Sequence, residues 1–370
     1  MTDTGGIRLN LAGIEAALER NGHDSCHIEF VPDRPGGSRW DGDNTDLLAA
    51  TEAALAAADR DGTDDAMWGQ GPVLTLDGTG LTLKGYAGPA SLTTWLEDFS
   101  TSLRQQGQSG LVRATSSVMP PHWLRHGREL RATAFVALDH ALTGRADVLL
   151  WGERAASWAA HAGGTAHLSA TPILQHDPAG PAEIAAHLTA TLRGSDTATL
   201  MQYEEAEARA ARVFVQRDGL AVYQAYDPAL PWTELIDRVR DAVVAEAPSA
   251  RLAFVAMTGL WAYSWEDRGR QLPALPTIST TDLRANHSVW SRHVPDAHGI
   301  QLLTGAHLDR AEDLSGWSVT EIRPDRFLVE DRNPDAWFSP DGPDPELVER
   351  ARRDFGRLII PDGPVGGSER

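Results

Sequence analysis

Histidine and cysteine residues form three groups whose spacing could support metal or proton chemistry. The first group, GHDSCH, contains His23, Cys26 and His27. Imidazole and thiolate are zinc ligands, but a closed zinc site needs four ligands and the chain has no second cysteine. The favoured interpretation is therefore structural, with His27 at the start of a strand and Cys26 as a small buried side chain. A metal site here would need further ligands from distant parts of the chain.

The second group is His122, His126 and Glu129 in the segment HWLRHGRE. Two imidazoles four residues apart lie on one face of a helix, which is the arrangement used by helical zinc hydrolases. In that signature a glutamate directly follows the first histidine. Here it does not, and Gly127 weakens the helix. A metal-binding or general-base role for these residues is therefore an alternative rather than the main prediction.

The third group, His287, His293 and His298, lies within twelve residues of the chain and includes Asp296. Histidine titrates near neutral pH, so such a set could transfer protons if the fold brought its members together. The competing interpretation is a solvated surface loop. Nucleophile elbows, Walker loops and dinucleotide fingerprints are all missing from the sequence. We therefore predict no catalytic residue, no metal and no cofactor. The alternative is an enzyme that uses Glu129 and the histidines of the second and third groups.

Aromatic and acidic residues suggest a different kind of surface. Three aromatic residues alternate directly after a predicted strand and are followed by two acidic residues, and a second acidic patch lies upstream. Tryptophan and tyrosine dominate the centres of protein interfaces, so we predict a partner-binding surface. The alternatives are a sheet face covered by its own helix and, for the acidic patch, a solvated helix face. The predicted partner-binding residues are Trp261, Tyr263, Trp265, Glu266, Asp267, Glu204 and Glu205.

The charge balance agrees with a cationic partner. Acidic residues outnumber Lys and Arg by 52 to 33, which gives a formal charge of −19. Such a charge attracts basic proteins and disfavours nucleic acid and anionic membranes, although it also serves solubility. The sequence shows neither an apolar run of about 20 residues nor the features of a signal peptide, so we expect a cytoplasmic protein. The single cysteine excludes an internal disulfide.

An internal repeat predicts the fold. The segment Gly80–Pro89, GLTLKGYAGP, returns as GLAVYQAYDP at Gly219–Pro228, and each is followed by an amphipathic helix and an apolar strand. Extending the comparison gives two copies, over roughly 71–193 and 211–358. In this alignment residues 147–151 are expected to form a strand that corresponds to residues 301–303. Helices are expected around 155–160 and 308–313. Internal repeats of this length indicate that one structural unit is used twice.

We therefore predict an α+β protein of two duplicated ferredoxin-like α/β sandwich halves, each with an antiparallel sheet. The expected organisation is an N-terminal extension at 1–70, a first half at 71–193, a second half at 205–360 and a disordered tail at 361–370. Exposed sheet edges in such halves would also allow the chain to form a homodimer.

The second copy resembles a known group of proteins. The tract Leu302–Gly305, LLTG, is followed by a helix, a strand, a tight turn into a strand at Phe327–Glu330, a proline-containing break and a final helix. This order is similar to that of immunity proteins associated with type VI secretion, including the TsiV3-like and Imm52-like families. The resemblance covers about 210–358 and implies a protein that binds and blocks a cognate toxin without catalysing a reaction.

The prediction for function is thus a non-catalytic, immunity-like protein that neutralises a basic toxin or effector by direct binding. Two alternatives remain open at this stage. One is a metal-assisted enzyme that uses a histidine and carboxylate cluster. The other is a structural or homo-oligomeric subunit.

Overall fold

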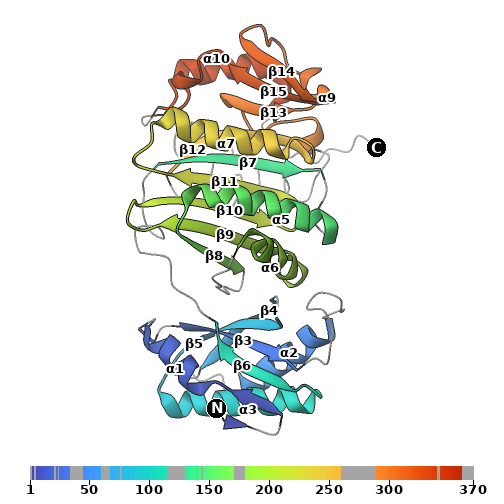
Figure 1. The fold of residues 1–370 in the computed structure, drawn as a ribbon. Helices are drawn as coiled ribbons and strands as arrows, with labels where there is room; N and C mark the ends of the chain where they lie inside the picture. The colour runs from blue at the N-terminus through green and yellow to red at the C-terminus, as the bar shows by residue number, and fades with distance from the viewer. Residues whose placement is uncertain are drawn as a thin grey trace. The chain divides into compact units, whose positions relative to one another are not determined.

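The computed structural model is mixed α+β, with two sheets and eight α-helices among the residues that it describes (Figure 1). The described residues are 2–3, 6–20, 22–23, 25–33, 45–59, 67–75, 77–115, 130–139, 141–142, 145–170, 180–259, 289–339 and 342–360. The chain divides into two compact units, described separately below. The first comprises Met1–Pro120, Thr143–Ser157 and Thr165–Leu200, and the second comprises Pro121–Leu142, Trp158–Gly164 and Met201–Arg370.

A six-stranded sheet belongs to the first unit. Its strand order is β1-β2-β6-β3-β5-β4, and every neighbouring pair is antiparallel except β2 and β6. The sheet thus draws strands from both sides of residue 70, where the sequence predicted a boundary. Its strands and the helices between them are β1 (Thr2–Asp3), β2 (Ile7–Leu9), α1 (Leu11–Arg20), β3 (Ser25–Pro32), α2 (Thr45–Ala58), β4 (Trp68–Leu74), β5 (Thr79–Lys84), α3 (Pro89–Gln105) and β6 (Gly110–Ala114).

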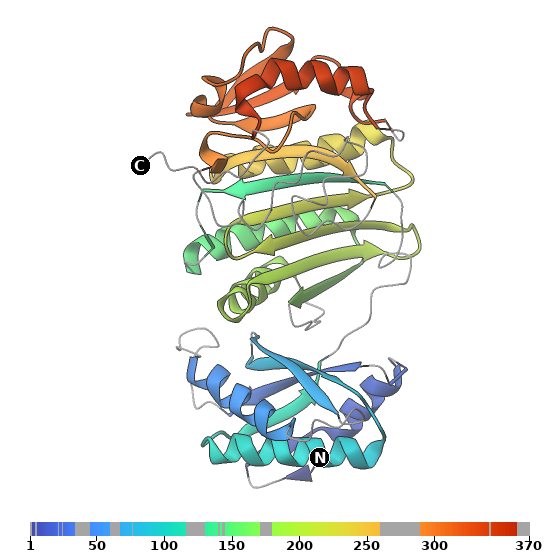
Figure 2. The same ribbon diagram turned by 180° about the vertical axis from the view of Figure 1, so that it is seen from behind.

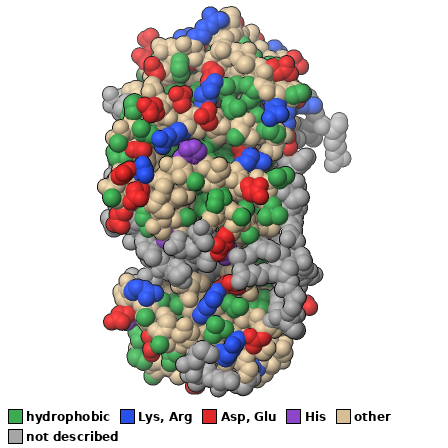
Figure 3. Space-filling view, in the orientation of Figure 1, with side chains coloured by type: hydrophobic (Ala, Val, Ile, Leu, Met, Phe, Trp, Pro, Cys, Tyr) green, Lys and Arg blue, Asp and Glu red, His purple; other side chains and the backbone are tan. Residues whose placement is uncertain are grey.

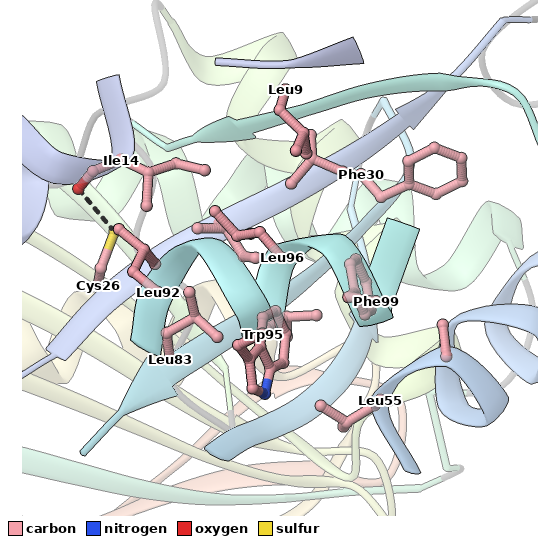
Figure 4. Close-up of a cluster of buried hydrophobic side chains, with 14 of the residues drawn as sticks. Leu9, Ile14, Cys26, Phe30, Leu55, Leu83, Leu92, Trp95, Leu96 and Phe99 are labelled. Atoms are coloured by element: carbon pink, nitrogen blue, oxygen red, sulfur yellow. Dashed lines mark hydrogen bonds between the residues drawn. The ribbon is translucent and has the colours of Figure 1, made fainter. Parts of the chain in front are cut away.

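Helix α3 shows how the sequence pattern produces this core. Its apolar residues recur at helical spacing, so they share one face, and that face is buried. Figure 4 shows Leu92, Trp95, Leu96 and Phe99 beside side chains of the sheet and of α2. The ring of Trp95 stacks on Phe99 with centroids 5.0 Å apart. The predicted amphipathic helix and the hairpin that precedes it are therefore both present.

A nine-stranded sheet has the order β14-β15-β13-β12-β7-β11-β10-β9-β8. Pairing from β14 through β10 is antiparallel throughout. The strands from β14 to β10 belong to the second unit, β9 spans the division and β8 belongs to the first. The strands are β7 (Arg131–Leu138), β8 (Thr165–Ala170), β9 (Thr197–Glu204), β10 (Arg209–Gln216), β11 (Leu220–Tyr226), β12 (Ala250–Thr258), β13 (Ile300–Leu303), β14 (Trp317–Arg323) and β15 (Arg326–Asp331).

Helix α7 (Trp232–Glu246) contacts β7, β11, β12 and β13 and lies on one face of this sheet, as Figures 1 and 2 show from opposite sides. Tyr223 of β11 points toward the helix, because its hydroxyl donates to the buried Glu246 at 2.6 Å. Successive strand residues point to opposite faces, so Gln224 lies on the side away from α7. The remaining α-helices are α5 (Arg145–Ala159), α6 (Pro181–Gly194), α9 (Gly305–Leu308) and α10 (Pro345–Phe355).

One order of elements occurs in both sheets. In the first sheet the chain runs β3-α2-β4-β5-α3-β6, with neighbours β6-β3-β5-β4. In the second sheet the chain runs β7-α5 and later β10-β11-α7-β12, and the strands lie in the order β12-β7-β11-β10. The elements β8, α6 and β9 are inserted between α5 and β10. The recurring order therefore starts at β3 and β7, and it does not coincide with the copies at 71–193 and 211–358 that the sequence suggested.

The expected strand at 147–151 is wrong, because these residues lie inside α5. A short apolar run cannot be assigned to strand or helix by periodicity. Burial settles the question, since Val148, Trp151, Ala155 and Ala159 are buried at the spacing of a helical face. The helix expected around 308–313 is also misplaced: α9 begins at Gly305 and ends at Leu308. Among the described residues, none of the helices is both long and apolar enough to cross a bilayer.

Candidate functional site

Most of the residues that the sequence singled out lie outside the described part of the chain. Their proposed roles in catalysis or partner binding stay predictions. They are His122, His126, Glu129, His287, Trp261, Tyr263, Trp265, Glu266 and Asp267.

The two described histidines of the third group have different surroundings. His298 is buried and stacks on Phe254, with ring centroids 4.0 Å apart. The Nε2 atom of His293 lies 3.0 Å from Nη2 of Arg310. Burial, followed by the charge of Arg310, lowers the pKa of His293. A neutral imidazole nitrogen beside a guanidinium accepts a hydrogen bond, so Arg310 helps to orient this ring.

Asp296, the carboxylate of that group, forms an ion pair inside the fold. It is fully buried and accepts hydrogen bonds from Nε and Nη2 of Arg352, at 3.0 and 2.8 Å. The hydrogen bond that Arg352 donates to Asp296 is the largest influence that raises the pKa of Arg352. A bidentate pair of this kind fixes both side chains. These contacts assign Asp296 a structural role in joining the 289–298 segment to α10.

Sequence reasoning missed His307, the histidine with the largest pKa shift among the described residues. Its Nδ1 accepts from the backbone amide of Thr304 at 3.1 Å, and its Nε2 donates to the carbonyl of Trp290 at 3.0 Å. Burial lowers the pKa of His307 to about 4, and the bond to Trp290 opposes this shift only in part. The signal that could have revealed it is the Thr304-x-x-His307 spacing, which forms a capping box at the start of α9.

The GHDSCH residues point to separate neighbours. Cys26 and His27 are consecutive in β3 and therefore face opposite sides of the sheet. Sγ of Cys26 lies 3.9 Å from the carbonyl of Ile14, and burial raises the pKa of this thiol to about 12. Nδ1 of His27 lies 3.0 Å from the hydroxyl of Thr82, and His23 stacks on Tyr86. Within the described ranges, no group of three His, Cys, Asp or Glu side chains is arranged to hold a metal ion.

The alternative interpretation of the acidic patch at Glu204 and Glu205 was a solvated helix face, but these residues do not lie on a helix. Glu204 ends β9, and Glu205 is exposed in the turn that leads into β10. The segment 204–208 turns at Ala208, which has a φ of 52°. A partner-binding role for these two residues stays a prediction.

A larger acidic site appears at one flank of α7. It is a hollow of about 630 Å³, bordered by three carboxylates and one guanidinium. The residues come from α7, β13, β15 and the short helix η4 (Pro334–Ala336). They are Thr233, Ile236, Asp237, Arg240, Ile300, Glu330, Pro334, Asp335 and Phe338. We refer to this set as the acidic hollow.

Only some of the charged groups in the acidic hollow are paired with one another. Arg240 donates from Nε and Nη2 to the two carboxylate oxygens of Glu330, at 2.6 and 3.1 Å. The bond to Glu330, and then the charges of Asp241 and Asp237, outweigh burial and raise the pKa of Arg240. Asp237 and Asp335 are exposed and have no such hydrogen-bonded partner among the described residues. Two carboxylates are thus available to a cation from solution.

The floor of the acidic hollow is apolar. Ile236, Ile300 and Phe338 are buried and are held in place by the packing of α7 on β13 and β12. Neighbouring Trp337 is fixed through its indole nitrogen, which donates to the buried Asp331 at 3.0 Å. An apolar floor with charged groups at the rim has room for both the methylene groups and the charge of a long side chain. On the face shown in Figure 3, charged side chains of both signs are interspersed with hydrophobic ones.

The face of the sheet away from α7 carries a buried polar network. Gln224 donates from Nε2 to the hydroxyls of Thr133 and Thr258, at 3.2 and 3.0 Å, and accepts from Arg212 at 3.2 Å. The two threonine hydroxyls are 2.7 Å apart. These residues belong to four adjacent strands, so the network links β10, β11, β7 and β12 across this face of the sheet.

Comparison with known proteins gives little on which to base a function. No protein-family model matches the chain, and no curated protein matches it. The chain is similar to the solved structure of the Pseudomonas aeruginosa T6SS protein PA0821, with 11% identity and a TM-score of 0.38 over 62% of this chain and 73% of that chain. Similarity at this level carries no weight for function, which must be inferred from the surface of this protein.

Proposed function

We propose that this protein is a non-catalytic binding protein that captures a basic segment of a protein partner in the acidic hollow beside α7. The observation that supports it best is the combination of exposed Asp237 and Asp335 with a buried apolar floor. An arginine or lysine side chain can cover such a floor with its methylene groups and place its charge between the carboxylates. The formal charge of −19 would hasten the encounter with a basic protein.

In this proposal the partner is a basic toxin or effector that the protein neutralises by covering it, as immunity proteins do. A stable complex of this type buries roughly 1,200–2,000 Å² of surface, which is far more than one hollow. The acidic hollow would therefore be the centre of a wider interface. The aromatic and acidic segment 261–267 would contribute to the same function.

The enzymatic alternative has less support from the described residues. His293 contacts Arg310, His298 stacks on Phe254, and Asp296 is paired with Arg352. A homodimer remains the other alternative, because β14 lies at the end of the nine-stranded sheet and most of its residues are exposed.

The fold supports a related proposal. The order strand, helix, strand, strand, helix, strand, with the first strand between the third and fourth, is that of a ferredoxin-like unit. We propose that the chain contains two such units, one built from β3 to β6 and the other from β7 to β12. The second would carry β8, α6 and β9 as an insertion, and β13 to β15 as an extension of the sheet.

The function is tested by titrating the protein with a fluorescent oligo-arginine peptide and an oligo-glutamate peptide of the same length. The test variant carries Asp237→Lys and Asp335→Lys, and the control carries Glu97→Lys and Asp98→Lys on the exposed side of α3. Both variants raise the formal charge equally, so they separate a local site from the overall field. We expect oligo-arginine to bind the wild type and the control variant, and to bind the test variant about tenfold more weakly.

Salt should weaken the binding of oligo-arginine, because the attraction is electrostatic. Equal loss of affinity in the test and control variants would show that only the net charge matters and would contradict a site at the acidic hollow. Binding of oligo-glutamate as tight as that of oligo-arginine would contradict the cationic partner.

A further inference from the structure

A second hollow lies on the other flank of α7. It has a volume of about 510 Å³ and is formed by the end of α5, the short helix η1 (Ala160–Ala162), β10, β11 and α7. It shares no residue with the acidic hollow. Its lining residues are Trp158, His161, Ala162, Arg209, Ala210, Ala211, Ala225, Tyr226, Arg238 and Asp241. We refer to this set as the aromatic groove.

The floor of the aromatic groove consists of small side chains. Ala211 of β10 is paired with Ala225 of β11, and both are buried. Alanine at these positions leaves space above the strands that larger residues would fill. An apolar floor of this kind suits the apolar part of a ligand.

The aromatic wall of the groove is fixed in position. The indole nitrogen of Trp158 donates to the backbone carbonyl of Arg238 at 3.2 Å. Its ring meets Tyr223 edge to face, with centroids 5.2 Å apart. An indole held by a hydrogen bond and a ring contact offers a preorganised surface for another flat or apolar group, so little entropy is lost when one binds.

The basic groups at the groove differ in how firmly they are held. Arg209 donates from Nε to the carbonyl of Ala162 at 2.6 Å and pairs with Glu207 at 2.7 Å. Arg238 has a single ion pair among the described residues, with Asp227 at the long distance of 3.9 Å. The guanidinium of Arg238 therefore keeps most of its donors for a ligand.

An opposite charge accompanies Arg238. Asp241 lies three residues further along α7, so the two side chains project from the same side of the helix. Both line the groove, and Asp241 is exposed. Arg238 and Asp241 thus offer one cationic and one anionic contact at the rim of the groove.

We propose that the aromatic groove binds a small zwitterion with an apolar body, which is the chemistry of a free aromatic amino acid. Arg238 would bind the carboxylate through paired N–H donors, a geometry that suits guanidinium groups. Asp241 would accept hydrogen bonds from the ammonium group. The ring would lie over the alanine floor, against Trp158. This site is independent of the proposed protein-binding function.

Isothermal titration of the full chain with three related compounds tests the proposal. L-phenylalanine carries both charges, hydrocinnamate lacks the amine and phenethylamine lacks the carboxylate. We expect saturable binding of phenylalanine and roughly tenfold weaker binding of each compound that lacks one charge, because each leaves one charged group of the groove without its partner. Equal affinity for all three compounds, or no saturable binding of phenylalanine, would overturn the proposal.

Two variants assign the contacts. With Arg238→Gln, phenylalanine should bind no more tightly than phenethylamine, while the backbone carbonyl that holds Trp158 is retained. With Asp241→Asn, phenylalanine should bind no more tightly than hydrocinnamate. Glu234→Gln, an exposed residue of α7 that lines neither hollow, is the matched control and should leave all three affinities unchanged. Unchanged phenylalanine binding by Arg238→Gln, with circular dichroism that shows a native fold, would refute the assignment.

Discussion

Protonation of His307 should destabilise the C-terminal part of the protein in mild acid. The ring is fully buried, and its Nδ1 is an acceptor because it faces the amide of Thr304. A proton on Nδ1 would place two donors against each other. Other charged groups near the ring are His293, Asp325 and Arg326, of which only Asp325 favours the protonated form.

The magnitude follows from the difference between the two pKa values. In the unfolded chain His307 titrates at 6.5, and in the folded protein its pKa is lowered to about 4. Between these values the unfolded state binds more protons, so stability is present at high pH and is lost as the pH falls. At about 1.4 kcal/mol per pH unit, roughly 2 kcal/mol is lost between about pH 7 and about pH 5, and about 3 kcal/mol once folded His307 is protonated.

The assay is guanidinium unfolding at both pH values, followed by tryptophan fluorescence, because Trp290, Trp317 and Trp337 lie in this region and are buried. His307→Gln removes the titrating group, so this variant should lose about 2 kcal/mol less than the wild type over the same range. His293→Gln is a useful comparison, because burial also lowers the pKa of His293 and its effect has the same sign. If wild type and His307→Gln lose equal stability on acidification, the inferred role of His307 is refuted.

Three further predictions concern buried groups. Burial raises the pKa of the Cys26 thiol to about 12. Cys26 should therefore react with a disulfide reagent far more slowly in the native protein than in the denaturant-unfolded protein, and equal rates would contradict its burial. Asp296→Ala leaves Arg352 without its bidentate partner and should cost about 3 kcal/mol in chemical unfolding, whereas Glu349→Ala, which removes an exposed partner of the same arginine, should cost less than about 1 kcal/mol. Trp95→Phe removes the 2.8 Å bond to Asp59 and should lower the unfolding free energy by roughly 1 kcal/mol or more, and an unchanged value would contradict that contact.

The sequence predicted the elements whose signals are local. The apolar spacing in α3 and the Asp77–Gly80 turn identified a helix and a hairpin, because side-chain periodicity and turn chemistry act over a few residues. The repeated segments at 80 and 219 correspond to β5 and β11, which occupy equivalent places in the two sheets. The first strands of those arrangements, β3 and β7, were not recognised as equivalent because they share no evident sequence pattern.

The local signals failed where burial decides the structure. Residues 147–151 fit a strand by composition, and only their packing shows a helical face. The histidine groups drew attention by their spacing along the chain. Among the described residues, however, the largest histidine pKa shift is at His307, whose partner Trp290 lies seventeen residues away.

What the sequence by itself determined about this protein is its composition, its acidity and the order of most helices and strands. The tertiary structure decided which charged side chains lie close together. Asp237 on α7 and Asp335 on η4 are almost a hundred residues apart in sequence, and they border one hollow only because β13 and β15 extend the sheet beside α7. Contacts between such distant segments depend on the pairing of whole strands, which no local pattern of residues specifies.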